Sequence, residues 1–263
     1  MTELAPSLHA RPVGGLLREW RQRRRLSQLD LASEARISTR HLSFLETGRA
    51  QPSRDMVLHL AEQLDVPMRE RNVLLVAAGF APSFRERSLD DPALASVRSA
   101  VELVLERQKP YPAFAIDRHW RIVASNAALP ELYEGCAEEL LARPINGLRL
   151  TLHPEGMAPR IDNLAEWREH ILARMKQQID MTADPELLAL RRELLSYPAP
   201  EAHDAPLEQA VAVPFRVRTS LGLLSFFSTT TIFGTPVDVT LSELALELFF
   251  PADEATARAV ERR

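Results

Sequence analysis

Residues 23–52 read RRRLSQLDLASEARISTRHLSFLETGRAQP, and this stretch carries the strongest pattern in the chain. Ser27 and Asp30 stand three residues apart ahead of an apolar run, the spacing of a capping box, which predicts the start of a helix. Ser38 predicts the cap of a second short helix, which ends at Thr47, where the next residue is a glycine suited to a left-handed helix end. The stretch therefore predicts two short helices joined by a tight turn.

The sequence on either side predicts three more helices. An apolar face opposite an arginine-rich face predicts a helix over residues 16–25. Beyond the quoted stretch, Ser53 predicts the start of a fourth helix, and Pro67 opens a fifth that ends near Gly79. Five helices in such a short span predict a complete all-α domain over residues 1–80.

Charge is unevenly distributed along the 263 residues, whose formal net charge is -4. Residues 1–85 carry a net charge of +4 and the remainder carries -8, which fits a basic head that meets phosphate and an acidic body that does not. The one cysteine cannot form an internal disulfide, and no secretory leader and no apolar run of ~18 residues is seen. These features predict a cytoplasmic protein that does not span a membrane.

A second domain of α+β class is predicted after a linker. Residues 81–92 contain prolines and alternating charges without apolar periodicity, so we place the linker there and the second domain at 93–263. Its predicted helices cover residues 94–105, 161–179, 184–195 and 240–248. Its predicted strands cover residues 113–116, 121–124, 148–152, 211–217 and 223–233. Pro214 predicts that the fourth of these strands lies at a sheet edge, forming a hairpin with the fifth.

Polar side chains on the second short helix of the quoted stretch fit recognition of DNA. A major groove about 12 Å wide accepts one helix, and a second helix braced across it directs its N-terminal amides at phosphates. We expect Arg40 to pair with a guanine, Arg49 and Arg54 to meet phosphates, and the arginines at 23–25 to add positive field. The residues expected at double-stranded DNA are Gln28, Ser38, Thr39, Arg40, Ser43, Arg49 and Arg54.

This part of the chain closely resembles the helix-turn-helix of the XRE family, the repressors of phage and bacteria. The resemblance covers the whole five-helix span. One position departs from the family pattern, which has glycine in the turn where this chain has Arg36; a left-handed backbone there would cost roughly 1 kcal/mol. The matching features are Ser27-Gln28, Leu31-Ala32, Ile37-Ser38, Leu45-Glu46, Gly48-Arg49 and Pro52-Ser53.

The second domain resembles the C-terminal domain of MmyB-like transcription regulators, a PAS-like α+β domain regarded as a ligand sensor. The resemblance is carried by PAFAIDRHWRIVASNAA at 112–128, LHPEGMAPRIDNLAEWREHI at 152–171 and FSTTTIFGTPVDVTLSELALELFFPAD at 227–253. It implies a small, largely apolar ligand, for which a fatty acyl chain is one candidate.

Aromatic side chains of the predicted sheet are candidates for a ligand pocket under the covering helices. Asn126 or Thr230 would supply an orienting polar group. The alternative is that the aromatic residues simply fill the core. The full candidate set is Phe114, Ile116, Trp120, Asn126, Phe226, Thr230 and Phe233.

Signatures of catalysis and of metal binding are weak, so we predict no enzyme, no metal and no resident cofactor. Cys136 lies among glutamates, whose charge suppresses formation of a reactive thiolate. His153 and Asp162 would have to meet in space to share a metal, and no zinc spacing, phosphate loop or nucleophile elbow is present.

Together these features predict a sequence-specific transcription regulator that acts as a homodimer. In this hypothesis the C-terminal domain pairs two chains, and ligand occupancy changes the spacing of the two reading helices. These helices must lie about 34 Å apart, or a multiple of that distance, to meet facing half-sites. Two alternatives stay open: a protein-interaction or dimerisation module without a ligand, and an enzyme recruited to DNA. A co-purified small molecule would favour the sensor.

Overall fold

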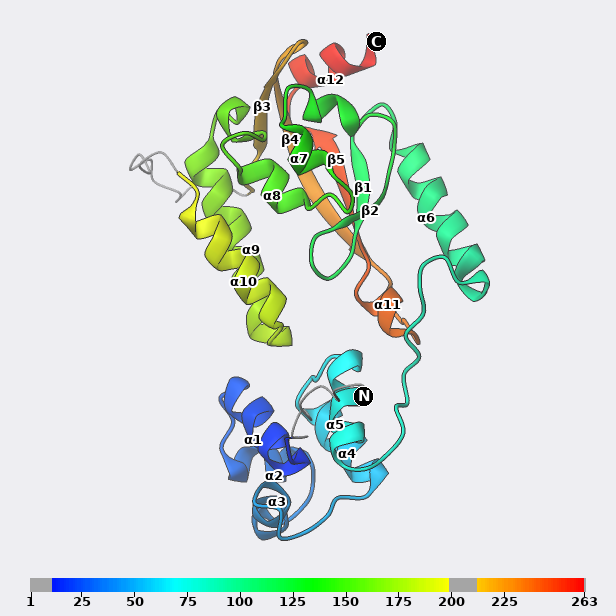
Figure 1. Ribbon diagram of the computed structural model, residues 1–263, viewed down its shortest axis with the longest axis vertical. Coiled ribbons are helices and arrows are strands. Elements are labelled where there is room, and N and C mark those ends of the chain that lie inside the picture. Colours follow the sequence, from blue (N-terminus) through cyan, green and yellow to red (C-terminus); the bar gives the residue numbers. More distant parts are fainter. Residues whose placement is uncertain (1–10, 199–211, 263) are drawn as a thin grey trace, which may run out of the picture. The chain divides into compact units, whose positions relative to one another are not determined.

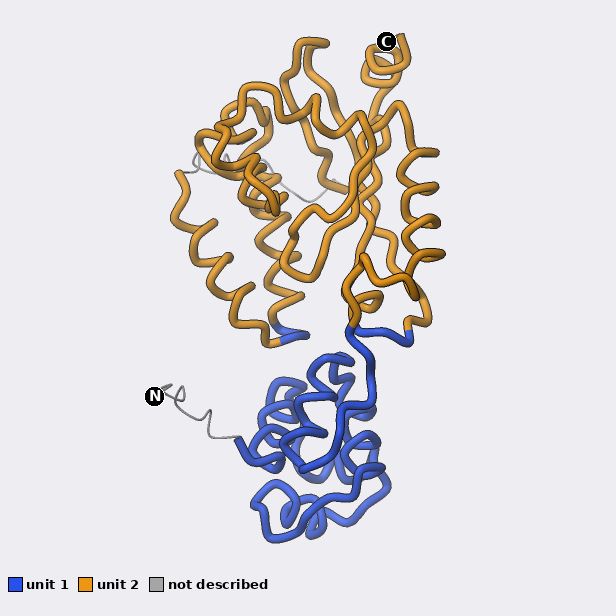
Figure 2. Tube along the Cα trace, turned by 45° about the vertical axis from the view of Figure 1, so that its right-hand side comes forward, with its two compact units in different colours: residues 1–86, 180–182, 237–239 blue, residues 87–179, 183–236, 240–263 orange. Residues whose placement is uncertain are grey.

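The computed structural model describes residues 11–198 and 212–262 and divides into two compact units. The first holds the described residues up to Glu86 together with 180–182 and 237–239 (Figure 2). The second holds the rest of the described chain. Each unit has its own buried core.

The N-terminal unit contains the five predicted helices. Their bounds are α1 Val13–Arg23, α2 Gln28–Glu34, α3 Thr39–Glu46, α4 Arg54–Gln63 and α5 Met68–Ala77 (Figure 1). Ser27 and Asp30 form the complete capping box at the start of α2, while Ser38 and Ser53 cap α3 and α4 through their hydroxyl groups. The predicted all-α class of this unit is confirmed.

Fully buried leucines on successive helices form the core of this unit. The side chains that show no measurable exposure or about 1 % are Leu17, Leu31, Leu42, Leu45, Leu60, Leu64, Leu74 and Leu75. Every helix of the unit, or the residue that ends it, contributes at least one of them, so each helix presents an apolar side to the others. The polar face of α3 is thereby left at the surface.

The turn between α2 and α3 is tight because Arg36 adopts a left-handed backbone with φ 53°. The amide of Ile37 donates to the carbonyl of Ala32 at 2.9 Å, which closes the end of α2 in the manner of a Schellman motif. The same left-handed position is filled by Arg25 after α1 and by Asp65 after α4. Non-glycine residues therefore end three helices of this unit.

The C-terminal unit is an antiparallel sheet with helices on both faces, which confirms the predicted α+β class (Figure 1). The strands are β1 Ala113–Ile116, β2 Ile122–Ser125, β3 Phe215–Thr219, β4 Gly222–Ile232 and β5 Ala245–Pro251. The α-helices are α6 Ala95–Arg107, α7 Glu138–Leu141, α8 Gly147–Leu152, α9 Leu164–Thr182, α10 Pro185–Ser196, α11 Val239–Ser242 and α12 Glu254–Glu261. Within the described residues of this unit, 3₁₀ turns cover Pro92–Leu94, Pro130–Tyr133 and Ala158–Arg160.

Strand order in the sheet is β2-β1-β5-β4-β3, with every neighbouring pair antiparallel. The predicted hairpin of β3 and β4 and the predicted edge position of β3 are confirmed. The strand begins after Pro214, and Val211, where the predicted strand started, lies outside the described residues. On one face α6 packs against residues such as Ala115 and Leu246. The larger core on the other face contains residues of α8, α9 and α10.

The prediction of a strand over residues 148–152 was wrong. This segment is helix α8, capped by Asn146, whose side-chain oxygen accepts hydrogen bonds from the amides of Leu148 and Arg149. Leu148, Leu150 and Leu152 are all buried. In this helix Leu148 and Leu152 lie on one side and Leu150 on the opposite side, and both sides are covered while Arg149 stays exposed. The apolar residues therefore alternate with less buried ones as they do in a strand.

The prediction of a helix over residues 240–248 was also wrong. Only the four residues of α11 are helical, and β5 follows as the central strand of the sheet. Leu246 belongs to the cluster beside α6, whereas Phe249 belongs to the cluster on the opposite face. A strand that is covered on both faces sends apolar side chains to each face in turn. Its sequence therefore lacks the alternation of apolar and polar residues that identifies a half-exposed strand.

Candidate functional site

The position of α3 is set by close packing against α1. A Cβ added at Gly14 would lie 2.2 Å from the backbone oxygen of Leu45 and 2.8 Å from that of Glu46. Only a residue without a side chain allows this approach. The last turn of α3 is thus held against the first turn of α1.

A buried ion pair and the hydrogen bond it accepts from Gln28 tie α1, α2 and α3 together. Glu46 accepts two hydrogen bonds from the guanidinium of Arg21, Nε to Oε1 at 2.6 Å and Nη2 to Oε2 at 2.9 Å. The side-chain amide of Gln28 donates to the same carboxylate at 2.8 Å. The bond to Glu46 raises the pKa of Arg21 further above its usual value, although burial alone would lower it. The predicted DNA residue Gln28 is therefore held in one orientation by α3.

The exposed surface of α3 contains most of the predicted DNA-contacting residues. Ser38, Thr39 and Arg40 are exposed at its N-terminal end, and Ser43 is half-buried one turn later. The guanidinium of Arg40 lies 5.3 Å from the ring centre of Phe44. The helix therefore presents a cation and two hydroxyl groups beside one another.

Phe44 is a surface aromatic residue that the sequence interpretation missed. Its ring is half-buried and also lies near Arg49, whose guanidinium carbon is 5.8 Å from the ring centre. Apolar side chains in a major groove contact the methyl group of thymine, and rings hold guanidinium groups in place. The signal in the sequence was an aromatic residue on the polar side of an amphipathic helix.

The remaining predicted arginines have different surroundings. Arg49 and Arg54 are exposed, and Arg54 also donates to the hydroxyl of Ser83. Arg24 uses its Nε and Nη2 to bond the backbone oxygens of Leu64 and Asp65, at 2.7 and 2.8 Å. The guanidinium of Arg24 thus closes the end of α4.

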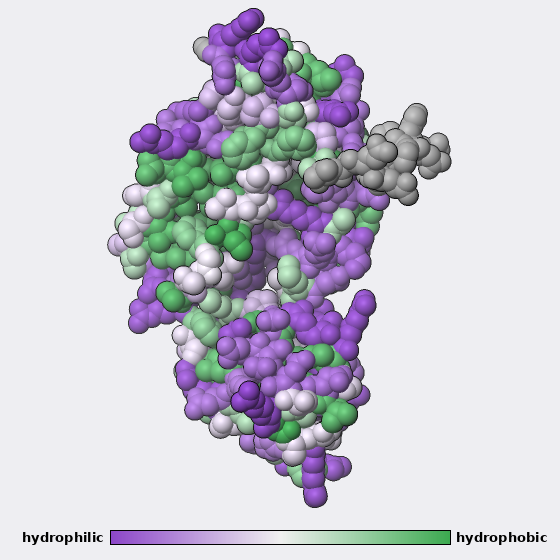
Figure 3. All heavy atoms as spheres, turned by 180° about the vertical axis from the view of Figure 1, so that it is seen from behind, coloured by the Kyte–Doolittle hydropathy of each residue, from purple (hydrophilic) through white to green (hydrophobic). Residues whose placement is uncertain are grey.

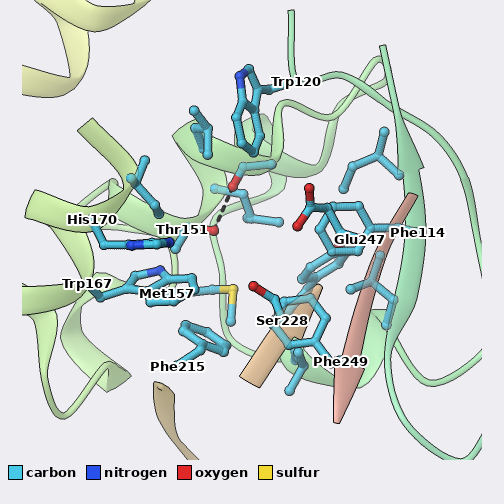
Figure 4. A pocket seen from close by; sticks show the side chains of 18 of the residues that line it. Phe114, Trp120, Thr151, Met157, Trp167, His170, Phe215, Ser228, Glu247 and Phe249 are labelled. Atoms are coloured by element: carbon cyan, nitrogen blue, oxygen red, sulfur yellow. Dashed lines mark hydrogen bonds between the residues drawn. The ribbon is translucent and has the colours of Figure 1, made fainter. Parts of the chain in front are cut away.

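The C-terminal unit contains a cavity of about 60 Å³ between the sheet and helices α8 and α9 (Figure 4). The close-up shows Trp167 and His170 side by side on α9, facing Phe114, Glu247 and Phe249 of the sheet. The other labelled residues of the lining are Trp120, Thr151, Met157, Phe215 and Ser228. On the measure by which one water needs ~10 to 15 Å³, the space holds a compact group rather than a long chain.

A charged pair lines one side of the cavity. Glu247 on β5 is only 3 % exposed and is bound by Arg174 of α9, with Nη1 to Oε2 at 3.2 Å and Nη2 to Oε1 at 2.5 Å. The hydroxyl of Thr230 donates to the same carboxylate at 3.0 Å. The guanidinium of Arg174 also lies 4.6 Å from the ring centre of Trp120. One carboxylate and one cation therefore neutralise each other at the cavity wall.

Two polar atoms of the cavity lining have no hydrogen-bond partner in the described part of the chain. They are the indole nitrogen of Trp167 and the hydroxyl oxygen of Tyr133, both fully buried atoms. Burial raises the pKa of Tyr133 well above its usual value, with a smaller contribution from Cys136. Burial likewise lowers the pKa of His170, helped by Arg174, whereas Glu247 and Glu166 act in the opposite direction.

The predicted ligand-contacting residues fall into three groups in the structure. Phe114 and Trp120 line the cavity, and Thr230 bonds the cavity residue Glu247. Ile116 and Phe226 belong to the same core cluster without lining the cavity. The other two, Asn126 and Phe233, lie elsewhere.

Asn126 and Phe233 have structural surroundings away from the cavity. The amide of Asn126 donates to the backbone oxygens of Leu105 and Tyr111, and its oxygen accepts from Ala113. Phe233 packs on the cluster beside α6, which lies on the opposite face of the sheet. Each of these residues directly follows the end of a strand, and the sequence alone cannot show on which face of the sheet such a side chain lies.

The sequence interpretation missed the residues that distinguish this cavity, namely Glu247, Arg174, His170, Trp167 and Tyr133. A signal was available for Glu247, which is the single charge within the apolar run Leu244 to Phe250. Within residues 11–198 and 212–262 no cluster of three potential metal ligands occurs, and none of the helices described is long and apolar enough to cross a membrane.

Comparisons with known proteins match both units. Residues 12–74 match the model of a helix-turn-helix domain, and residues 97–262 match that of the MmyB-like transcription regulator ligand binding domain. A protein of Methanoculleus marisnigri, named as an HTH-type transcriptional regulatory protein, is 35% identical over 119 residues. The match covers 44% of this chain and 39% of that protein, so the chain spans well under half of this relative.

Among solved structures, an RNA-binding light-oxygen-voltage receptor is 13% identical, with a TM-score of 0.25 over 95% of this chain and 62% of that one. The two family matches instead coincide with the five-helix arrangement and with the helix-covered sheet that holds the cavity. The chain therefore belongs to the MmyB-like transcription regulators, with a helix-turn-helix domain followed by the ligand-binding domain of that family.

Proposed function

We propose that this transcription regulator reads a specific DNA sequence through an XRE-type helix-turn-helix and that its C-terminal domain senses a small, largely apolar ligand. The proposed division is residues 1–80 for the DNA-binding domain, 81–92 for the linker and 93–263 for the sensor. Its proposed place of action is the cytoplasm, with DNA as its partner.

The observation that carries this proposal is the exposed N-terminal end of α3 on a rigid support. Thr39 and Arg40 project from a helix whose other side is fixed by Gly14 packing and by the Arg21–Glu46 pair. A side chain held rigidly loses less conformational entropy when it binds, which is the condition for reading a base edge. The residues proposed to meet DNA remain Gln28, Ser38, Thr39, Arg40, Ser43, Arg49 and Arg54.

A substitution pair separates base reading from phosphate binding. Arg40→Ala should cost about 1 to 3 kcal/mol on the preferred site and relax preference at one base pair. Arg54→Ala should weaken binding to all duplexes alike and reduce the slope of affinity against salt. The measurement is a salt series of binding isotherms on a site selected from random DNA and on a scrambled duplex. Equal losses on both duplexes for Arg40→Ala would reject its assignment to a base.

The cavity supports the proposed sensor role, because a sensor needs room for its ligand. Its lining is aromatic and aliphatic apart from a few polar groups, which is the usual composition of a ligand pocket. Three of the predicted residues stay in the proposed site because of where they lie. Phe114 and Trp120 line the cavity, and Thr230 bonds the cavity residue Glu247. A fatty acyl chain, which the family resemblance implied, is one ligand to test.

We also propose that the C-terminal domain pairs two chains. One α3 covers one half-site, so facing half-sites require two copies. Seen from behind, hydrophobic side chains gather on this unit over and beside α6 (Figure 3). Leu103 and Val104 of α6 and the paired Phe227 and Phe250 are 39 to 57 % exposed. An apolar surface of this kind supports association with a second copy.

A further inference from the structure

The polar side of α3 also carries a large apolar group, the ring of Phe44. Around the helix axis Phe44 falls within about 100° of Arg40 and Ser43, because residues three and four apart share one side of a helix. Leu42 and Leu45 on the opposite side are buried in the core of the unit. The ring itself is half-buried, so part of its apolar surface stays open beside the residues proposed to meet DNA.

Neighbouring arginines restrain this ring. A helical side chain leans toward the preceding turn, so the ring of Phe44 lies over the turn that contains Arg40, whose guanidinium carbon is 5.3 Å from the ring centre. Gly48, with a left-handed φ of 72°, turns the chain back, and the amide of Arg49 donates to the carbonyl oxygen of Phe44 at 2.8 Å. The guanidinium of Arg49 lies 5.8 Å from the same ring centre. Attraction between the two cations and the ring keeps the ring in place on this surface.

The chemistry of the major groove determines what such a ring recognises. Guanine, adenine and cytosine present hydrogen-bonding groups there, whereas thymine also presents a methyl group on C5. A ring placed against a hydrogen-bonding group removes its water without supplying a partner, which costs free energy. A ring placed against the methyl group removes apolar surface from water, which is favourable. Of the four bases, the ring therefore favours thymine.

The spacing along α3 places this contact close to the base that Arg40 is proposed to read. Four residues of an α-helix advance about 6 Å, and successive base pairs are stacked about 3.4 Å apart. The ring of Phe44 also leans back toward Arg40. The two side chains therefore reach positions within about two base pairs of each other.

We infer that Phe44 is a specificity-determining residue whose ring recognises the C5 methyl group of a thymine within about two base pairs of the guanine proposed for Arg40. The inference rests on the proposed sequence-specific reading of DNA and adds one defined chemical group to it. Arg40 reads the acceptors of its base, whereas Phe44 reads a single methyl group.

Replacing thymine by uracil tests the inference, because the two bases differ only in that methyl group. Binding isotherms of the full-length protein are measured on a site selected from random DNA and on duplexes in which one thymine at a time is uracil. At one thymine of a half-site the wild-type protein should lose about three- to fivefold in affinity, as expected for the burial of one methyl group. Phe44→Ala should bind the thymine and uracil duplexes alike.

Two further variants control this comparison, which is a double-mutant cycle between protein and DNA. Phe44→Gln removes the ring but keeps a longer side chain that suits a helix, and it should also abolish the difference between the two duplexes. The test therefore does not depend on the folding of Phe44→Ala alone. Val73→Ala, at an apolar site on α5 that is 45 % exposed, should retain the wild-type difference.

Two results would overturn the inference while sequence-specific reading stands. One is an equal effect of uracil on wild-type, Phe44→Ala and Phe44→Gln protein. The other is a selected site on which the wild-type protein tolerates uracil at every thymine. If the wild-type protein binds the selected and scrambled duplexes alike, the proposed reading of a specific sequence fails, and the role of Phe44 fails with it.

Discussion

Arg36 holds the turn between α2 and α3 in a backbone conformation that glycine adopts without strain. Its φ of 53° brings Cβ close to the following carbonyl oxygen, which costs roughly 1 to 2 kcal/mol for an L-residue. The side chain is exposed, so it recovers little through packing. Arg36 therefore lowers the stability of the turn that sets the angle between α2 and α3.

Arg36→Gly should raise the free energy of unfolding by about 1 kcal/mol, because glycine removes the contact of Cβ with the carbonyl oxygen. This value already allows for the greater flexibility that glycine gives the unfolded chain, which opposes the gain. Urea denaturation followed by circular dichroism measures this change. Arg36→Ala is the control, since it removes the same long side chain and keeps Cβ. A gain of equal size in Arg36→Ala would show that the side chain, and not the backbone, is responsible.

At the scale of the element, α1 and α3 pack closely enough that backbone meets backbone. Gly14 makes this contact, while Gly15 faces open space, where an added Cβ would meet only the Pro12 ring at 3.9 Å. The two glycines are adjacent in the sequence and indistinguishable by composition. Their roles differ because successive residues of a helix point about 100° apart.

Gly14→Ala should destabilise the N-terminal unit by about 1 to 3 kcal/mol and weaken DNA binding, because α3 must shift away from α1. Gly15→Ala should stabilise the unit by about 0.5 to 1 kcal/mol, since alanine is the better helix former. Thermal unfolding and DNA titration of the two variants measure both effects. A Gly14→Ala protein as stable as Gly15→Ala would contradict the close approach of the two helices.

At the scale of the whole molecule, the chain combines two units with different kinds of surface. The N-terminal unit gathers arginines around α3, and the C-terminal unit exposes aromatic side chains on its sheet. Phe227 and Phe250 stand opposite each other in the β4–β5 ladder and are 39 and 41 % exposed. These surfaces suit different partners, DNA for the first and the proposed second copy for the other.

The double substitution Phe227→Glu with Phe250→Glu should convert the proposed dimer to a monomer. It should weaken binding to DNA that carries two facing half-sites far more than binding to DNA that carries a single half-site. Charges in an apolar interface lose hydration without gaining a partner. Light scattering and DNA titration provide the readout. The control is Leu188→Glu on α10, a side chain of comparable exposure (44 %) on a helix that covers the opposite face of the sheet. It should leave the oligomeric state and DNA binding unchanged. A wild-type chain that is monomeric both free and on DNA would remove the pairing step.

Local patterns in the sequence were sufficient for the five N-terminal helices and their caps. Ser27 with Asp30, Ser38 and Ser53 satisfy amide groups within three residues of themselves, so the information needed is local. The hairpin of β3 and β4 was predictable for the same reason. In contrast, α8 and β5 were assigned the wrong secondary structure, because both are enclosed on more than one side.

The sequence by itself determined the family, the α+β class of the second unit and the polar character of α3, since each depends on residue types at short, regular spacing. Only the tertiary structure decided that Gln28 is fixed by Glu46, that Phe233 lies away from the cavity and that Glu247, Trp167 and Tyr133 meet in it. These contacts join residues far apart in the chain. Their geometry depends on which faces of strands and helices meet, and no short pattern of residues records that choice.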